Sequence, residues 1–132
     1  MIEKINHIGI AVPDLDKAIE TYEKLGFHVD HREEVASQKV EVAMITVGES
    51  RIELLQPTAE DSPIARFIEK KGPGIHHLAV GVDDIDKALK EYSKEDIVMI
   101  DKTPRDGAHG TRIAFVHPKS TGGVLLELCM EI

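Results

Sequence analysis

Apolar residues along the chain follow two spacings, one typical of strands and one typical of helices. The stretch 4–12 is rich in small and branched apolar residues, as strands are, and apolar residues at helical spacing follow it. The same order returns at 75–82 and in the residues after it. The apolar residues at helical spacing are Leu15, Ala18, Ile19 and Tyr22 in the first stretch and Ile85, Ala88, Leu89 and Tyr92 in the second.

This strand–helix unit is a sequence repeat. Residues 5–22 align with residues 75–92 without a gap, and eight of the eighteen positions are identical. Two unrelated units would share only their apolar spacing, so we interpret the match as an internal duplication. Asp14 and Asp84 are among the identical pairs, and each lies where a helix N-cap belongs.

Three strand-like segments follow each predicted helix. They are 27–33, 38–47 and 50–56 in the first half and 97–101, 111–117 and 124–131 in the second. Residues 57–74 form a linker with a short helix from about Pro63 to Lys71. The sequence therefore predicts an α+β fold of two tandem βαβββ modules, about 1–56 and 75–132, within a single domain of residues 1–132. We expect them to form a curved eight-stranded mixed sheet around a metal-binding cleft.

Composition and charge narrow the classes of partner. Apolar residues make up 42% of the chain and no stretch is long enough to cross a bilayer, so we expect no membrane partner. The formal net charge of −8 disfavours nucleic acid. The single cysteine, Cys129, excludes an internal disulfide and lies in an apolar run. We interpret it as a buried strand residue in a protein of the reducing cytoplasm.

The repeat also duplicates polar residues at apolar sites. His7 and His77 occupy the same place in the first strand of each half, and Glu53 and Glu127 the same place in the last. Strand alternation could point one such Glu to solvent, but two matched Glu with two matched His favour a shared site. Pseudo-twofold symmetry would bring all four side chains to one point. The sequence predicts a site for one divalent ion such as Co, Ni, Zn, Mn or Fe.

Longer segments carry a resemblance to a known family. His117-Pro118-Lys119-Ser120 followed by Gly123-Val124-Leu125-Leu126-Glu127-Leu128 is the most specific of them. Over its whole length the chain resembles the methylmalonyl-CoA epimerases of the vicinal oxygen chelate (glyoxalase/bleomycin resistance) superfamily. Some members carry Gln where this chain has Glu53. Further matching segments are His7-Ile8-Gly9-Ile10-Ala11-Val12, Val40-Glu41-Val42-Ala43, Gly74-Ile75-His76-His77-Leu78-Ala79, Val82-Asp83-Asp84-Ile85 and Arg112-Ile113-Ala114-Phe115.

The resemblance implies an isomerase that interconverts (2R)- and (2S)-methylmalonyl-CoA by proton transfer at C2 through a metal-stabilised enolate. It implies cobalt as the metal, with nickel, zinc, manganese or magnesium as alternatives, and a homodimer. It also favours Glu41 and Glu127 as the acid/base pair. Glu41 is the extra carboxylate, because its repeat partner is Arg112. A solvated strand residue is the alternative reading of Glu41.

An acyl-CoA substrate carries phosphates, which require local positive charge on this acidic chain. The candidates are Lys39, Arg105, Arg112 and Lys119, and scattered surface charges are the alternative. Two other functions stay open at this point. One is a glyoxalase I-type lactoylglutathione lyase, which shares the His/Glu/His/Glu pattern. The other is a non-catalytic binding protein of the same fold.

Overall fold

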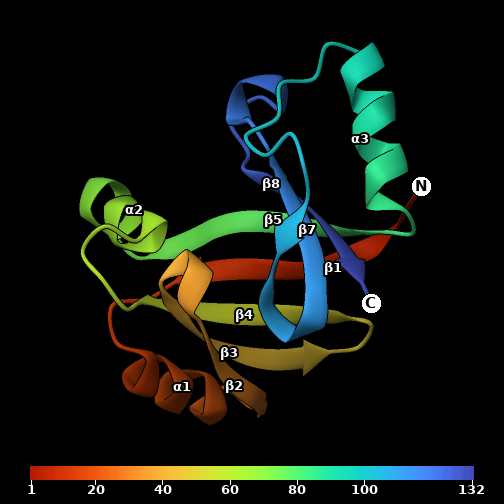
Figure 1. Cartoon of the computed structure of the whole chain (residues 1–132). Helices are drawn as coiled ribbons and strands as arrows, with labels where there is room; N and C mark the ends of the chain where they lie inside the picture. The colour runs from red at the N-terminus through yellow and green to blue at the C-terminus, as the bar shows by residue number, and fades with distance from the viewer. The chain divides into compact units, whose positions relative to one another are not determined.

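The computed structural model describes all residues from 1 to 132, and its elements follow the order that the repeat predicts (Figure 1). The α+β fold is confirmed, because eight strands form one mixed sheet in the order β2-β3-β4-β1-β5-β8-β7-β6. No helix is both long enough and apolar enough to cross a membrane. The elements are β1 (Ile2–Ala11), α1 (Leu15–Lys24), β2 (Val29–Val35), β3 (Val40–Val47), β4 (Ser50–Pro57), α2 (Pro63–Lys71), β5 (Gly74–Val82), α3 (Ile85–Lys94), β6 (Arg105–Asp106), β7 (Thr111–Val116) and β8 (Leu126–Glu131).

The chain divides into two compact units, and the boundaries between them fall within strands β1 and β5. One unit is continuous and comprises residues 8–76. The other joins residues 1–7 to residues 77–132. The continuous unit contains β2, β3, β4, α1 and α2, and the discontinuous unit contains α3, β6, β7 and β8. The expected single domain with a linker at 57–74 stays a prediction.

Both repeated helices begin at the aspartates that the sequence marks. The side chain of Asp14 accepts a hydrogen bond from the backbone N–H of Lys17 at 3.1 Å, and Asp84 accepts one from Lys87 at 3.1 Å. Each carboxylate thereby satisfies one of the backbone donors that a helix start leaves without a partner. The linker helix α2 has the predicted bounds, Pro63–Lys71, and is capped by Ser62.

In the continuous unit, α1 packs on one face of β3 and β4. Leu15 of α1 lies in a buried cluster with Ala43, Ile45 and Leu54. Successive side chains of a strand point to opposite faces, so Met44 and Glu53 lie on the other side of these strands. We call the side packed by α1 or α3 the helix face. The opposite side is the glutamate face, which carries Glu53 in this unit.

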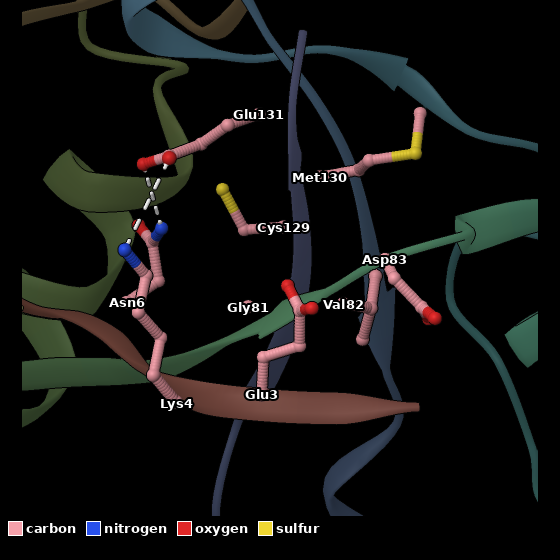
Figure 2. A pocket seen from close by; sticks show the side chains of 9 residues that line it. All are labelled: Glu3, Lys4, Asn6, Gly81, Val82, Asp83, Cys129, Met130 and Glu131. Atoms are coloured by element: carbon pink, nitrogen blue, oxygen red, sulfur yellow. Dashed lines mark hydrogen bonds and ion pairs between the residues drawn. The ribbon is translucent and has the colours of Figure 1, made fainter.

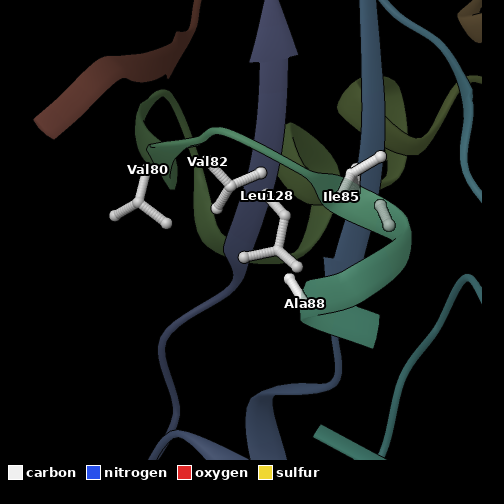
Figure 3. Close-up of a cluster of buried hydrophobic side chains, with 6 residues drawn as sticks. Val80, Val82, Ile85, Ala88 and Leu128 are labelled. Atoms are coloured by element: carbon white, nitrogen blue, oxygen red, sulfur yellow. The ribbon is translucent and has the colours of Figure 1, made fainter. Parts of the chain in front are cut away.

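In the discontinuous unit, α3 packs on the sheet in the same way. Figure 3 shows Ile85 and Ala88 of this helix beside Val82 and Leu128 of the strands, in a cluster that also includes Val80 and Ala114. Glu127 precedes Leu128 and therefore lies on the glutamate face. Apolar residues also pack on that face, so the sheet is covered by buried side chains on both sides. They are Ala79, Ile113, Phe115 and Cys129.

The expected strand at 97–101 is wrong. This segment makes only an isolated bridge between Met99 and Val116. The N–H groups of Ile100 and Asp101 both donate to the carbonyl of Phe115, at 2.8 and 3.3 Å. The Phe115 N–H donates to the side-chain carboxylate of Asp101 at 2.9 Å. This carboxylate replaces a backbone carbonyl as the acceptor, so the segment 97–101 does not continue a backbone ladder with β7. The outer neighbour of β7, on the side opposite β8, is instead the two-residue β6, Arg105–Asp106.

Candidate metal centre

Three of the four predicted ligands come together in the discontinuous unit. His7 lies on β1, His77 on β5 and Glu127 on β8. In the register of the sheet, Glu127 lies between Ala79 of β5 and Phe115 of β7. His77 precedes Ala79 by two residues, so its side chain points to the same face as Glu127. All three side chains are buried.

The donor atoms of these side chains converge. Nε2 of His7 lies 3.0 Å from Nε2 of His77. The Glu127 carboxylate lies 3.5 Å from Nε2 of His7 through one oxygen and 3.3 Å from Nε2 of His77 through the other. The two imidazole rings meet edge to face, with centroids 5.1 Å apart. Two imidazole nitrogens and a carboxylate therefore surround one point away from water.

This geometry fits a metal ion. Two donor atoms that bind one ion at about 2.1 Å each lie about 3.0 Å apart at a right angle and about 3.4 Å apart at the tetrahedral angle. The three observed separations, 3.0, 3.3 and 3.5 Å, cover this range. Nitrogen and oxygen donors of this kind suit borderline divalent ions. The residues present can therefore hold a divalent cation.

The second ring nitrogen of His7 has a partner that fixes its orientation. Nδ1 of His7 lies 2.7 Å from the side-chain oxygen of Asn6. Since an amide oxygen only accepts, Nδ1 carries the proton and Nε2 keeps its lone pair for a metal. The Asn6 amide in turn donates to Glu131 at 3.1 Å, and Lys4 lies 4.0 Å from the same carboxylate (Figure 2). The sequence reasoning missed Asn6, because nothing in the pattern separates it from its strand neighbours.

Glu53, the fourth predicted ligand, belongs to the continuous unit. It is buried and lies opposite Met44 in the β3–β4 ladder, as Glu127 lies opposite Phe115. Burial raises the pKa of Glu53 to about 7, the positive charge of Arg51 counteracts part of this rise, and the negative charge of Glu33 adds to it. A buried carboxylate of this kind gains from a cation. Its assignment as a ligand stays a prediction that rests on its equivalence to Glu127.

Glu41, the predicted acid/base partner of Glu127, lies on the helix face. Its carboxylate accepts a hydrogen bond from Arg32 at 2.9 Å, and the same guanidinium binds Asp16 of α1 at 2.8 Å. Ala43, two residues further along β3, packs in the cluster beneath α1. Glu41 therefore points away from the face that carries Glu53. Its catalytic role stays a prediction, and its contacts favour a structural one.

The four predicted substrate-binding cations lie in different surroundings. Lys39 forms an ion pair with Asp61, and Lys119 is exposed in the turn before β8. Arg112 follows the buried glutamate-face residue Thr111 and lies on the helix face, next to the Pro104 carbonyl at 3.5 Å. Arg105 differs, because it lies over the ring of Phe115, with its guanidinium carbon 5.5 Å from the centroid.

Arg105 is connected to the metal centre through this ring. Phe115 also meets the imidazole of His77 edge to face, at 5.5 Å between centroids. Asp101 holds the guanidinium from the side at 3.1 Å. Of the four predicted cations, Arg105 is the one whose contacts lead to His77 within the same unit, which favours it as a substrate contact.

Cys129 is buried, as expected, but it is also closer to the ligands than its apolar setting indicated. It lies two residues after Glu127 on the same face, and its sulfur lies within 4.8 Å of donor atoms of His7 and Glu127. It also lines a cavity of about 280 Å³ together with Asn6 and Glu131 (Figure 2). Glu3 and Asp83 line the same cavity, so its acidic wall disfavours phosphate.

Comparison with known proteins places these features in context. Residues 6–115 match the family model of the Glyoxalase/Bleomycin resistance protein/Dioxygenase superfamily. The chain is 43% identical to the ethylmalonyl-CoA/methylmalonyl-CoA epimerase of Cereibacter sphaeroides, over 97% of this chain and 98% of that protein. It is 41% identical to the mitochondrial methylmalonyl-CoA epimerase of Homo sapiens, over 95% of this chain and 72% of that protein. A solved methylmalonyl-CoA epimerase in complex with methylmalonyl-CoA and NH4+ superposes with a TM-score of 0.95 at 38% identity, covering 99% of this chain and 96% of that one.

Proposed function

The chain belongs to the Glyoxalase/Bleomycin resistance protein/Dioxygenase superfamily, and from this premise we infer that it is an isomerase, a methylmalonyl-CoA epimerase. The observation that carries the inference is the buried cluster of His7, His77 and Glu127 in a chain about 40% identical to methylmalonyl-CoA epimerases over nearly its full length. Among the relatives matched over most of this chain, those with a named activity include epimerases from bacteria and mammals, which disfavours a lactoylglutathione lyase or a non-catalytic binding protein. Methylmalonyl-CoA is accordingly the substrate, and the reaction inverts its C2 centre.

We propose that His7, His77 and Glu127 hold one divalent ion and that Glu53 is the fourth ligand. The convergence of the first three donors and the repeat equivalence of Glu53 support this assignment. When bound, the ion supplies Lewis acidity to the thioester and carboxylate oxygens of the substrate. Cobalt is the metal that the family resemblance favours, and mixed imidazole and carboxylate donors suit it as one of several borderline divalent ions.

Other side chains of the discontinuous unit have separate roles in acid/base chemistry, ligand orientation, exclusion of water and substrate binding. Glu127 is a buried carboxylate, and we assign it one of the two acid/base roles at C2. Asn6 holds the His7 ring in one orientation and one tautomer. Phe115 and the other apolar residues around Glu127 exclude water from the reacting carbon. Arg105 offers a cation to an anionic group of the substrate, and it lies over the Phe115 ring, which also contacts His77.

The compartment and the assembly are also proposals. A single buried cysteine, Cys129, that forms no disulfide agrees with a reducing cytoplasm. A homodimer is expected from the family resemblance alone.

The decisive experiment is an exchange assay on the purified protein. Single epimers of methylmalonyl-CoA are incubated in D₂O, and both deuterium at C2 and the epimer ratio are followed. The expected result is deuterium incorporation with full equilibration of the two epimers, loss of both after chelation, and recovery with Co²⁺. Turnover of a glutathione hemithioacetal without any epimerisation would instead support the lyase. Metal binding with no turnover of either compound would support a binding protein.

A further inference from the structure

We propose that Arg105 binds the free carboxylate of the substrate, and that Asp101 is the positioning residue that holds the Arg105 guanidinium in place. The proposal rests on the proposed epimerase function and names the anionic group that Arg105 recognises. The CoA part of the substrate carries phosphates, whereas the acyl part carries a carboxylate on C2 itself. The contacts of Arg105 within the discontinuous unit favour the carboxylate.

The register of the sheet places Arg105 on the glutamate face. Arg105 of β6 lies opposite Ile113 of β7. Ile113 packs on the glutamate face together with Phe115 and Cys129. Directly opposed residues of an antiparallel ladder share a face. The Arg105 side chain therefore lies on the same side of the sheet as Glu127, to which we assign proton transfer at C2.

The distance from Arg105 to His77 suits the carboxylate better than the phosphates. The guanidinium carbon lies 5.5 Å from the Phe115 ring centre, which lies 5.5 Å from the His77 ring centre, so at most about 11 Å separates guanidinium and imidazole. In a CoA thioester about thirteen bonds lie between the sulfur and the first phosphate, a reach of about 15 Å when extended. The carboxylate, by contrast, is bonded directly to C2. An extended substrate therefore brings its carboxylate, and not its phosphates, to a cation this close to His77.

Asp101 fixes the guanidinium without occupying the atoms that a ligand carboxylate needs. One Asp101 oxygen lies 3.1 Å from Nε of Arg105, and the other accepts the backbone N–H of Phe115 at 2.9 Å. The structure pairs neither of the two Nη groups of Arg105, and the side chain is 43% exposed. These groups carry four N–H donors, and arginine binds a carboxylate through two parallel N–H···O bonds. The end of the guanidinium is therefore available to an anion.

The segment that carries Arg105 is held closely against β7. The N–H of Gly107 donates to the carbonyl of Thr111 at 3.0 Å, and the Thr111 hydroxyl donates to the carbonyl of Ala108 at 2.7 Å. A Cβ on Gly107 would lie 2.6 Å from the Thr111 hydroxyl oxygen and 2.7 Å from a methyl group of Ile113, so only glycine allows this approach. A segment ordered in this way holds the guanidinium before a ligand arrives, which reduces the entropy lost on binding.

This arrangement determines which thioesters the protein selects. Both epimers of the substrate carry the C2 carboxylate, so one subsite serves both directions of the reaction. A guanidinium is weakly hydrated and stacks on aromatic rings, so Arg105 can exchange water for a carboxylate at little cost. Propionyl-CoA has the same CoA part but lacks the carboxylate, and it should gain nothing from Arg105.

The test measures binding of malonyl-CoA and propionyl-CoA to the metal-loaded protein by calorimetry. Malonyl-CoA carries the carboxylate and has no stereocentre at C2, so it serves as an equilibrium ligand. Arg105→Gln should weaken malonyl-CoA binding by about ten- to a hundredfold and leave propionyl-CoA binding within about twofold, with unchanged metal content and circular dichroism. Asp101→Asn keeps an acceptor for the Phe115 N–H and should weaken malonyl-CoA binding alone, by about two- to fivefold. Lys102→Gln, at the exposed neighbouring position, is the matched control and should change neither affinity.

A kinetic comparison separates the carboxylate from the phosphates. Methylmalonyl-pantetheine keeps the carboxylate and lacks every phosphate of CoA, so Arg105→Gln should raise the KM for it by the same factor as for methylmalonyl-CoA. A rise for methylmalonyl-CoA alone, or equal weakening of malonyl-CoA and propionyl-CoA, would assign Arg105 to the phosphates and overturn the proposal. Unchanged malonyl-CoA binding in Arg105→Gln would overturn it as well, and equal loss of both ligands in Asp101→Asn would refute the positioning role. If the unmodified protein binds malonyl-CoA through Arg105 but epimerises nothing, the proposed function fails while the carboxylate subsite stands.

Discussion

Removing the side-chain amide of Asn6 should weaken metal binding without unfolding the protein. In Asn6→Ala the His7 ring loses its 2.7 Å contact and becomes free to rotate and to change tautomer. A buried neutral hydrogen bond contributes about 0.5–1.5 kcal/mol, which corresponds to about a 2- to 13-fold change in affinity. Partners that orient a ligating histidine typically contribute about 10- to 100-fold. We therefore expect the metal dissociation constant to rise about tenfold or more.

The assay is competition for Co²⁺ or Zn²⁺ against a coloured chelator, with circular dichroism as the check on folding. The matched control is His76→Phe, at the position equivalent to Asn6 in the repeat. His76 packs against Phe67 of α2 at 5.0 Å between ring centroids, so its removal should leave affinity within about threefold. Asn6→Asp keeps an acceptor and should bind metal at least as well as the unmodified protein. An unchanged dissociation constant in Asn6→Ala would refute the orienting role.

Three further outcomes follow from the same contacts. His77→Ala should lose most of its metal in elemental analysis while its sheet persists. The reason is that only two of the proposed ligands in its unit remain, and they cannot enclose the ion. Full metal occupancy would contradict the assignment. Arg105→Gln should raise the KM for methylmalonyl-CoA. It should also reduce the increase of KM with ionic strength, because contacts between exposed charges are screened by salt. If KM does not change with salt in either the unmodified protein or Arg105→Gln, Arg105 makes no ionic contact with the substrate. Burial, with a smaller effect of Lys71, lowers the pKa of His76 to about 4, so the folded state favours the neutral imidazole. The folded state should therefore lose stability as the pH falls from about 6.5 towards 4. His76→Phe should be less sensitive to acid over that range in thermal melts, and an identical pH profile for the two proteins would count against this reasoning.

Much of the fold was accessible from the sequence because its signals are local. The N-caps Asp14 and Asp84 and the bounds of α2 follow from residues that act within one helical turn. Three of the four metal-ligand candidates also come together, while their role as ligands stays a prediction. The segment 97–101 was wrongly predicted as a strand because it has the apolar composition of one. Its hydrogen bonds depend instead on the contact between the Asp101 side chain and Phe115 of β7.

The face of each strand was the information that the sequence lacked. In β3, Val42, Ala43, Met44 and Ile45 are all buried, so no alternation of polar and apolar residues reveals which side meets α1. Glu41, which the asymmetry of the repeat singles out, lies on the helix face of β3, and its catalytic role stays a prediction.

The sharing of β1 between a continuous and a discontinuous unit bears on how the chain folds as it leaves the ribosome. Residues 8–76 can collapse early, since all their contacts within that unit lie on one uninterrupted segment. The other unit must bring residues 1–7 against a segment that ends at residue 132, and contacts so distant in sequence form late. His7 therefore meets His77 and Glu127 only late in folding. Metal capture would then mark the completion of folding, and a nascent chain that stops before β8 would lack a site to load.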